Sequence, residues 1–308
     1  ADASVEVLAA APPRGPDRRY AQLAAFAEIG RNDAPSDCRT LWPPVQQAGG
    51  EGCCTMVVRP GEDVQAAVDA LGPAGGCVCL KPGVHELRDV LRLRTGKLSI
   101  HAEAPGAAVL RRAGGVPVIA IGGAAAAANL PVRDVQLSGL VIQLGSLADR
   151  GTDFEGLLSV AAGAARITVE GCRFTVQDFA GRTAGLRAAA ADLAVRDCRF
   201  ERLPAGVLLE EGSRDVAITD CAFLGDGTEA PDVDTGLAAV AAKACEGALR
   251  IERNAVAGYL RGVLLGGEAS DGKPLRTDAA WVMGNIVLRT EPREEGRLQP
   301  AAGGEVRG

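Results

Sequence analysis

An eight-residue motif that recurs along the chain constrains its fold more than any other feature. The motif reads apolar, any residue, apolar, two of any kind, then Cys, Asn or Leu, any residue, apolar. Its copies are unevenly spaced, but the spacing falls within the roughly 20–50 residues that are typical of solenoid repeats. The copies begin at Val135, Ile167, Leu193, Val216, Leu249 and Ala280.

A second, shorter motif follows most copies and consists of a glycine that leads an apolar run. Each repeat therefore predicts a strand, a sharp turn, a second strand, a corner loop and a third strand. Alternation within each strand directs one of its sides inward, and successive strands are expected to stack about 4.8 Å apart. The leading glycines are Gly156, Gly185, Gly206, Gly236 and Gly262.

The composition suits a narrow interior that is filled by small side chains. Apolar residues make up 47% of the 308 residues, but glycine contributes 40 residues and aromatic residues only 3%. The net charge of −6 argues against a nucleic-acid partner, which requires a basic face. No apolar run reaches the roughly 18 residues of a membrane span. We therefore expect a soluble protein, either cytoplasmic within an assembled particle or secreted.

The predicted entry to the solenoid has a different pattern. A short strand at 55–58 is followed by Asp63, which can cap a helix over 64–71 with apolar residues at i, i+3, i+4 and i+7. Gly75-Gly76 then leads into a strand at 77–80. This order resembles the opening coil of pectin-lyase-like proteins, in which the helix closes the N-terminal end. The resemblance implies an all-β, single-stranded right-handed parallel β-helix with an N-terminal capping helix.

The repeats divide the chain into three parts. Residues 1–54 are predicted to be an irregular segment that packs on the solenoid or leads into it, residues 55–288 the β-helix, and residues 289–308 a polar tail. The N-terminal block, with Cys53-Cys54 before the first strand, is similar to β-helix proteins found beside bacterial contractile, phage-tail-like injection systems. This fainter resemblance covers residues 1 to about 110 and implies no active site.

Cysteines occupy the same motif position in three consecutive repeats, and asparagines continue it. We expect a buried ladder of small side chains, for which a metal or redox site is the alternative. In-register parallel neighbours point the same way and make poor disulfides. The ladder comprises Cys172, Cys198, Cys221, Asn254 and Asn285.

Five further cysteines gather near the start of the solenoid. The total of nine is odd, so at least one is not paired within the chain. Disulfides, buried thiols and a structural zinc site all remain open, although adjacent Cys-Cys and C-x-C differ from the usual C-x₂₋₄-C spacing of zinc ligands. We predict no metal or other cofactor. The five are Cys38, Cys53, Cys54, Cys77 and Cys79.

The corner loops between second and third strands are the best candidates for a functional groove, because they should project from one edge. Carboxylates that bind calcium beside a basic residue are the machinery of β-helix polysaccharide lyases. Ordinary solvated polar loops are the simpler interpretation. The candidates are Asp149, Asp153, Glu155, Asp178, Arg182, Arg202, Asp226, Asp232, Asp234, Tyr259 and Arg261.

Two observations weaken the enzymatic interpretation. The chain has only two histidines, His85 and His101, and both precede the repeats. We expect His85 to be a packed structural residue rather than a catalytic one. Aromatic residues that could stack on sugars are scarce. We therefore predict a rigid structural or binding module, as in a phage-tail-like assembly. A carbohydrate-active enzyme, a lyase or epimerase that uses calcium, is the alternative.

The predicted C-terminal end lacks an equivalent of the capping helix. The sequence after Val287 is polar and rich in glycine, without helical periodicity. An uncovered last coil exposes strand edges that invite pairing. We expect a protein partner, a further domain or a second copy of the chain to cover this end, with a self-covering tail as the alternative. A polysaccharide remains a candidate ligand.

Overall fold

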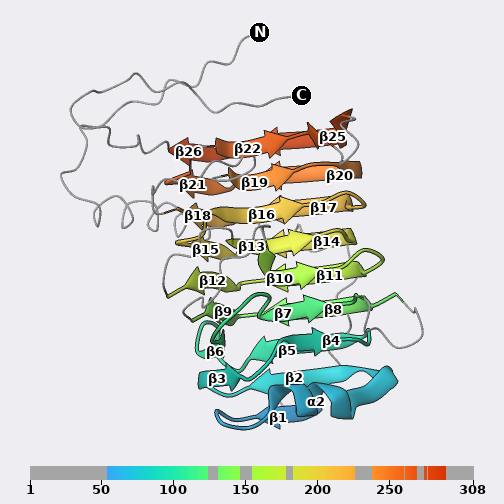
Figure 1. Cartoon of the computed structure of the whole chain (residues 1–308), viewed down its shortest axis with the longest axis vertical. Coiled ribbons are helices and arrows are strands. Elements are labelled where there is room, and N and C mark those ends of the chain that lie inside the picture. The colour runs from blue at the N-terminus through green and yellow to red at the C-terminus, as the bar shows by residue number, and fades with distance from the viewer. Residues whose placement is uncertain are drawn as a thin grey trace, which may run out of the picture.

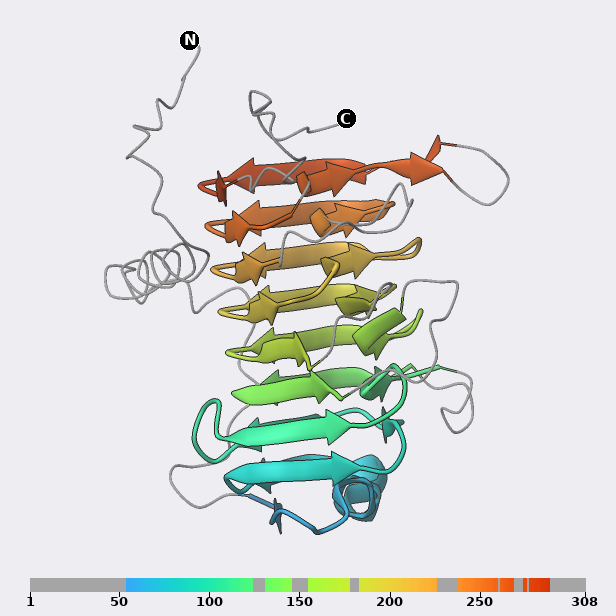
Figure 2. The same ribbon diagram turned by 60° about the vertical axis from the view of Figure 1, so that its left-hand side comes forward.

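The computed structural model describes residues 54–123, 131–145, 155–177, 183–225, 238–259, 261–268, 274–275 and 277–288. They form a solenoid of three parallel sheets that run side by side along its long axis (Figure 1, Figure 2). Among these residues, no helix has the length and apolar character that crossing a membrane requires.

The chain visits the three sheets in a fixed order, and each strand pairs in parallel with its counterpart one coil away. Sheet A contains β1 (Met56–Val58), β2 (Gly76–Leu80), β5 (Leu98–Ala102), β8 (Arg133–Ser138), β11 (Ala165–Glu170), β14 (Ala191–Arg196), β17 (Arg214–Thr219), β20 (Cys245–Glu252) and β25 (Thr277–Met283). Sheet B contains β3 (Gly83–Leu87), β6 (Ala108–Arg112), β9 (Leu140–Leu144), β12 (Arg173–Val176), β15 (Arg199–Glu201), β18 (Ala222–Leu224), β21 (Ala255–Ala257) and β26 (Ile286–Leu288).

The third strand of each coil belongs to sheet C. Its strands are β4 (Leu91–Leu93), β7 (Ile119–Ile121), β10 (Glu155–Val160), β13 (Thr183–Ala188), β16 (Ala205–Leu209), β19 (Ala238–Ala242) and β22 (Arg261–Leu265). A short antiparallel pair, β23 (Gly267–Glu268) and β24 (Pro274–Leu275), follows β22. The predicted parallel β-helix, with three strands in each coil, is confirmed.

The recurring motif misses the first coils, in which the corners are longer and differ in sequence. Strands β5, β6 and β7 belong to these coils and continue the same sheets toward the N-terminus. The stretch 116–130 is expected from its Gly/Ala content to form a wide turn, but it contains β7. The three buried or half-buried residues of β7 fit the sheet because Ile119 and Ile121 alternate inward.

Inward side chains stack in columns because neighbouring strands keep the same register. Phe174, Phe200 and Phe223 form one such column, with ring centroids 4.7 Å apart and ring planes within 3–5° of parallel. This spacing matches that of the strands. His85 begins the column below Leu110; its imidazole is 1% exposed, and Nε2 lies 2.9 Å from the Lys81 carbonyl oxygen. The structure thus gives His85 the packed position expected of it.

In two coils, the glycine near the start of the third strand makes room for the phenylalanine of the next coil. A Cβ added to Gly185 would lie 2.4 Å from Phe200 Cδ1, and one added to Gly206 would lie 2.4 Å from Phe223 Cδ1. Contacts this short are incompatible with a methyl group unless the ring shifts. The glycine of one coil and the phenylalanine of the next therefore depend on each other.

A single left-handed residue makes the sharp turn between sheets A and B. It directly precedes the Cys, Asn or Leu of the motif, and Gly or the short polar Asp tolerates this backbone conformation at little cost. In one coil this position is occupied by Arg253, whose guanidinium donates two hydrogen bonds of 2.7 Å to Asp220 in the previous coil. The φ angles are +66° at Gly139, +60° at Gly171, +52° at Asp197, +56° at Asp220, +54° at Arg253 and +64° at Gly284.

The Cys/Asn ladder lies inside this corner. Cys172, Cys198 and Cys221 are 1%, 2% and 2% exposed, and no disulfide joins any two cysteines that the structure describes. The neighbouring thiol and burial raise the pKa of Cys172, and burial raises that of Cys198. The Asn254 side-chain oxygen accepts the Cys221 amide at 2.9 Å, and Asn285 accepts the Asn254 amide at 2.9 Å. The asparagine side chains and the thiols therefore both bridge successive coils, since the three thiols donate to main-chain carbonyl oxygens of the previous coil at 3.5–3.7 Å.

Helix α2 (Val64–Leu71) closes the N-terminal end, followed by a short 3₁₀ turn, η2 (Gly72–Ala74). Asp63 Oδ1 accepts the Ala66 amide at 3.1 Å, which caps the helix as the sequence predicts. The apolar face of α2 is buried at the foot of the solenoid, against β1, β2 and β4 (Figure 2). The predicted capping helix is confirmed.

The dependence of Gly185 on Phe200 can be tested by a double-mutant cycle. We expect Gly185→Ala to lower the free energy of unfolding by about 1–3 kcal/mol, because the methyl group displaces the ring. In a Phe200→Leu background the same change should cost less, although the Gly206 carbonyl oxygen, 3.0 Å from the added Cβ, keeps the rescue partial. Urea unfolding measures the four variants. Equal costs in both backgrounds would show that the ring and the glycine are independent.

Candidate functional site

The structure describes four of the eleven predicted groove residues, and all four belong to the corner between sheets B and C. Glu155 begins β10 and is exposed, Arg202 directly follows β15 and is exposed, and Arg261 begins β22. Seven lie outside the described residues: Asp149, Asp153, Asp178, Arg182, Asp226, Asp232 and Asp234.

Tyr259 does not line a groove rim, and this prediction is wrong. Its side chain is 2% exposed and belongs to the hydrophobic core together with Val256 and Val263. Gly258, with a φ of +75°, makes the turn that precedes it. Burial of a large aromatic surface stabilises this short corner.

Two carboxylates of these coils, Glu201 at this corner and Glu210 at the other end of the sheet C strand, pair with basic side chains. Glu201 is 8% exposed and contacts the guanidinium groups of Arg173 and Arg199, the former at 2.8 Å from Nε. Glu210 likewise pairs with Arg187 at 3.1 Å and Lys243 at 2.8 Å. Within the described part of the chain, no three carboxylates converge as a shared metal site would require. These pairs stabilise the coil surface and resemble no calcium site.

The outer face of sheet C is apolar in the same region. Leu208 is in register with Ala241, which in turn pairs with Leu264, and all three alternate with core residues. Leu208 and Ala241 are only 2% and 1% exposed and form a cluster separate from the main core. The outer face of sheet C is therefore apolar in these coils, and its side chains are buried or half-buried.

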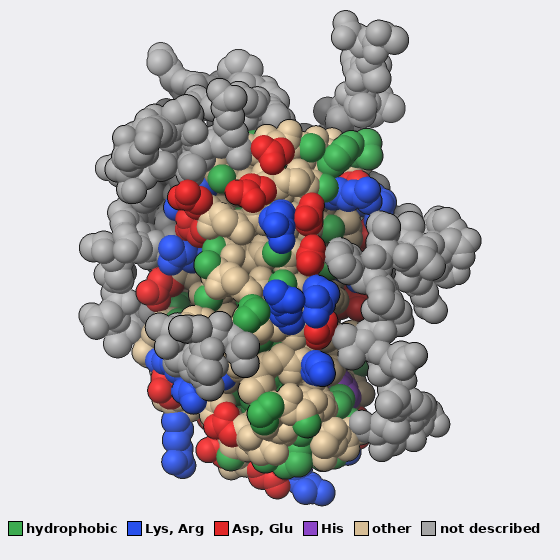
Figure 3. Space-filling view, turned by 90° about the vertical axis from the view of Figure 1, so that its right-hand side faces the viewer, with side chains coloured by type: hydrophobic (Ala, Val, Ile, Leu, Met, Phe, Trp, Pro, Cys, Tyr) green, Lys and Arg blue, Asp and Glu red, His purple; other side chains and the backbone are tan. Residues whose placement is uncertain are grey.

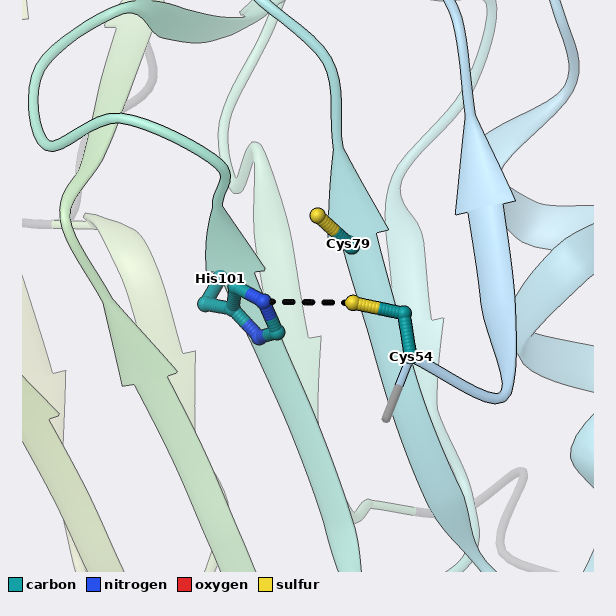
Figure 4. A group of neighbouring side chains, drawn as sticks. All are labelled: Cys54, Cys79 and His101. Atoms are coloured by element: carbon teal, nitrogen blue, oxygen red, sulfur yellow. Dashed lines mark hydrogen bonds between the residues drawn. The ribbon is translucent and has the colours of Figure 1, made fainter. Parts of the chain in front are cut away.

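A second candidate site lies at the N-terminal end, on the outer face of sheet A. Cys79 on β2 and His101 on β5 are register partners, and both point outward because Val78, Leu80 and Ile100 point into the core. Figure 4 shows Cys54 reaching toward the same point from the chain that enters β1.

The ligand atoms of Cys54, Cys79 and His101 all lie within 4.8 Å of one another. Cys54 Sγ is 3.5 Å from His101 Nε2 (Figure 4), and Cys77 Sγ is 3.2 Å from the other ring nitrogen, Nδ1. The Thr55 hydroxyl accepts the Cys77 amide at 3.1 Å, which holds the entering chain against β2. The cluster therefore joins three segments that are well separated in the sequence.

Partial burial shapes the electrostatics of this cluster. Burial raises the pKa of Cys79 to about 12, and the thiol of Cys54 contributes in the same direction. Burial lowers the pKa of His101, which favours the neutral imidazole at pH 7. A neutral imidazole has a lone pair that can bind a metal ion.

The sequence interpretation missed this cluster because it did not recognise β5. Without the pairing of β2 with β5, His101 has no known neighbour, and Cys77 and Cys79 appear only as two residues on one side of a strand. The alternation Leu98-x-Ile100-x-Ala102 is the signal that would have placed His101 on the outer face.

The C-terminal end of the solenoid forms the third candidate site. In the part of the chain that the structure describes, β25 and β26 are the last strands of their sheets, and Val287 occupies the column that contains Phe223 and Val256. Those two residues are 0% and 3% exposed, whereas Val287 is 40% exposed. Figure 3 shows hydrophobic side chains at both ends of the face that it presents, with acidic and basic groups interspersed between them. The exposed group on this coil comprises Trp281, Met283, Ile286 and Val287.

Comparison with solved structures identifies the fold. The chain matches the Dettilon tailspike protein with a TM-score of 0.54 and 12% identity, over 78% of this chain and 48% of that one. It matches a mutant tailspike of E. coli bacteriophage HK620, in complex with a pentasaccharide, with a TM-score of 0.52 and 17% identity, over 75% and 43% of the two chains. A pectin methylesterase from Aspergillus niger gives a TM-score of 0.46 and 11% identity, over 82% and 92%.

The likenesses to the two tailspikes establish the right-handed parallel β-helix fold and leave the activity open, since one fold serves many functions. The chain spans less than half the length of either tailspike. No protein-family model matches the sequence, and no curated protein matches it.

Proposed function

We propose that this chain is a rigid β-helical structural or binding module that joins a larger protein assembly through the C-terminal end of its solenoid. The observation that carries the proposal is the contrast between the two ends. Helix α2 covers the first coil, whereas the inner column reaches the surface at Val287. Exposed apolar side chains beside unpaired strand edges favour association.

The proposed occupant of this end is a protein partner that supplies a further coil. Its strands would pair with the edges of β25 and β26, which no described strand occupies, and its apolar side chains would cover Ala280 and Val287. A second copy of this chain is a poor source of that coil, because α2 blocks head-to-tail stacking. Two copies could only meet through the same C-terminal end.

The assembly that we favour is phage-tail-like. This finer proposal rests on the resemblance of residues 1 to about 110 to proteins found beside contractile injection systems. The shared fold with two phage tailspikes is consistent with it. Because one of those tailspikes is described with a pentasaccharide, a polysaccharide is a candidate ligand for the side of the solenoid.

A carbohydrate-active enzyme is the alternative, and it makes a different prediction. We expect no calcium-dependent release of unsaturated uronides from pectate or alginate, because Glu201 at the corner is already paired with Arg173 and Arg199, and both histidines of the chain lie in the first coils. An absorbance assay over a panel of polyuronates measures this release. Turnover that is lost in Asp232→Ala or Arg182→Ala, but kept in Thr219→Ala on the far sheet, would establish the enzyme instead.

The docking end is tested by light scattering of the isolated chain across a range of concentrations. Without its partner, the wild-type chain should associate reversibly through the exposed last coil. Val287→Lys should shift it to the monomer, since a charge in the inner column opposes apolar contact. Thr219→Lys, on the outer face of β17 in the middle of the stack, is the matched control and should associate like the wild type.

Removal of residues 289–308 completes this test. We expect the shortened chain to associate at least as strongly as the full chain, because the last coil remains the docking surface. A strict monomer that is equally soluble and stable without these residues would show that the end needs no cover, and the proposal would be wrong.

A further inference from the structure

We propose that Cys54, Cys79 and His101 form a binding site for a thiophilic divalent metal ion of the Zn²⁺ class, which fastens the entering chain to the first coils. The two thiols and the imidazole come from three separate segments and converge on the outer face of sheet A (Figure 4). The site is independent of the docking end at the opposite side of the solenoid.

The distances fit a tetrahedral ion. With Zn–S of about 2.3 Å and Zn–N of about 2.0–2.1 Å, a sulfur and a nitrogen ligand lie roughly 3.6 Å apart, and two sulfur ligands about 3.8 Å apart. Cys54 Sγ and His101 Nε2 are 3.5 Å apart, and all three ligand atoms lie within 4.8 Å of one another. Small side-chain rotations would therefore complete the geometry.

The donor set indicates which class of metal ion would bind. Two thiolates and one imidazole are soft and intermediate ligands, which select Zn²⁺ and similar transition metals over Ca²⁺ or Mg²⁺. The described residues supply three ligands and leave the fourth position to solvent or another donor. An ion held in this way is tetrahedral but accessible from one side.

Cys77 supports the site without being a ligand. Its Sγ lies 3.2 Å from His101 Nδ1, on the ring edge opposite the proposed metal. A hydrogen bond from Nδ1–H to this sulfur would fix the tautomer that leaves Nε2 free to bind the ion, as partners of metal-bound histidines commonly do. The Thr55 hydroxyl, which accepts the Cys77 amide, holds Cys54 nearby.

The metal would cross-link the solenoid at its least regular point. Cys54 precedes β1, Cys79 lies in β2, and His101 lies in β5. One ion would thus tie the entering chain to two successive coils of sheet A, next to the end that α2 covers. Metal binding to the folded state alone must raise its stability.

The test uses the full, untagged chain, reduced and treated with a chelator, and titrated with Zn²⁺ in competition with a chromophoric chelator. We expect one equivalent to bind and the melting temperature to rise. Cys54→Ser, Cys79→Ser and His101→Ala should each weaken binding by more than about 100-fold. Cys77→Ser is the matched control on the same face, and should weaken it by only about 10–100-fold, as is usual for a residue that orients a ligand.

Co²⁺ provides a second measurement on the wild-type chain, which keeps the test valid if a variant fails to fold. Its visible bands should have the intensity of a tetrahedral site, and its charge-transfer bands should correspond to two thiolates. Absence of binding, or binding that survives all three ligand substitutions, would overturn the proposal. A Cys54–Cys79 disulfide found by mass spectrometry of protein purified without reductant would overturn it as well.

Discussion

Direct stacking of each coil's inward side chains on those of the next is the constraint on which the rest of this structure depends. The parallel strands fix the separation, and the three phenylalanine rings follow it with centroids 4.7 Å apart. A column forms only if every coil turns at the same point of the repeat. The left-handed residue before each Cys, Asn or Leu of the motif makes that turn. The glycine at the start of the third strand gives the ring its space. Register, turn and glycine are thus consequences of one repeated contact.

A stack of this kind has two ends, and they are finished differently. At the N-terminal end, α2 buries its apolar face, and its first turn is capped by Asp63. Beside it, two cysteines and a histidine converge on the outer face. At the other end, the last coil exposes Trp281 and Val287. We infer that the first end is closed from within the chain and the second from outside it.

The sequence predicted the fold well because the fold repeats. The motif in Cys172 and its counterparts marks the same corner in every later coil, and α2 begins and ends where the periodicity places it. The sites were harder to predict because they depend on pairing between coils. His101 meets Cys79 only through the register of β2 and β5, a coil in which the motif is absent. Tyr259 appeared to be a rim residue because it lies in a short corner, but a narrow core takes any large apolar ring within reach.

The asymmetry of the two ends is tested most directly by residue-resolved amide hydrogen exchange in the isolated chain. Along a parallel strand, amides point alternately to the two neighbouring strands. The Ile286 amide donates to the Asn254 carbonyl oxygen in the previous coil and should stay protected. The Val287 amide points away from that coil and should exchange quickly, while that of Phe223, at the equivalent position of an inner coil, should exchange slowly. Equal protection of Val287 and Phe223 in the monomeric chain would mean that the chain covers its own end, and would contradict the inference that the C-terminal end is closed from outside the chain.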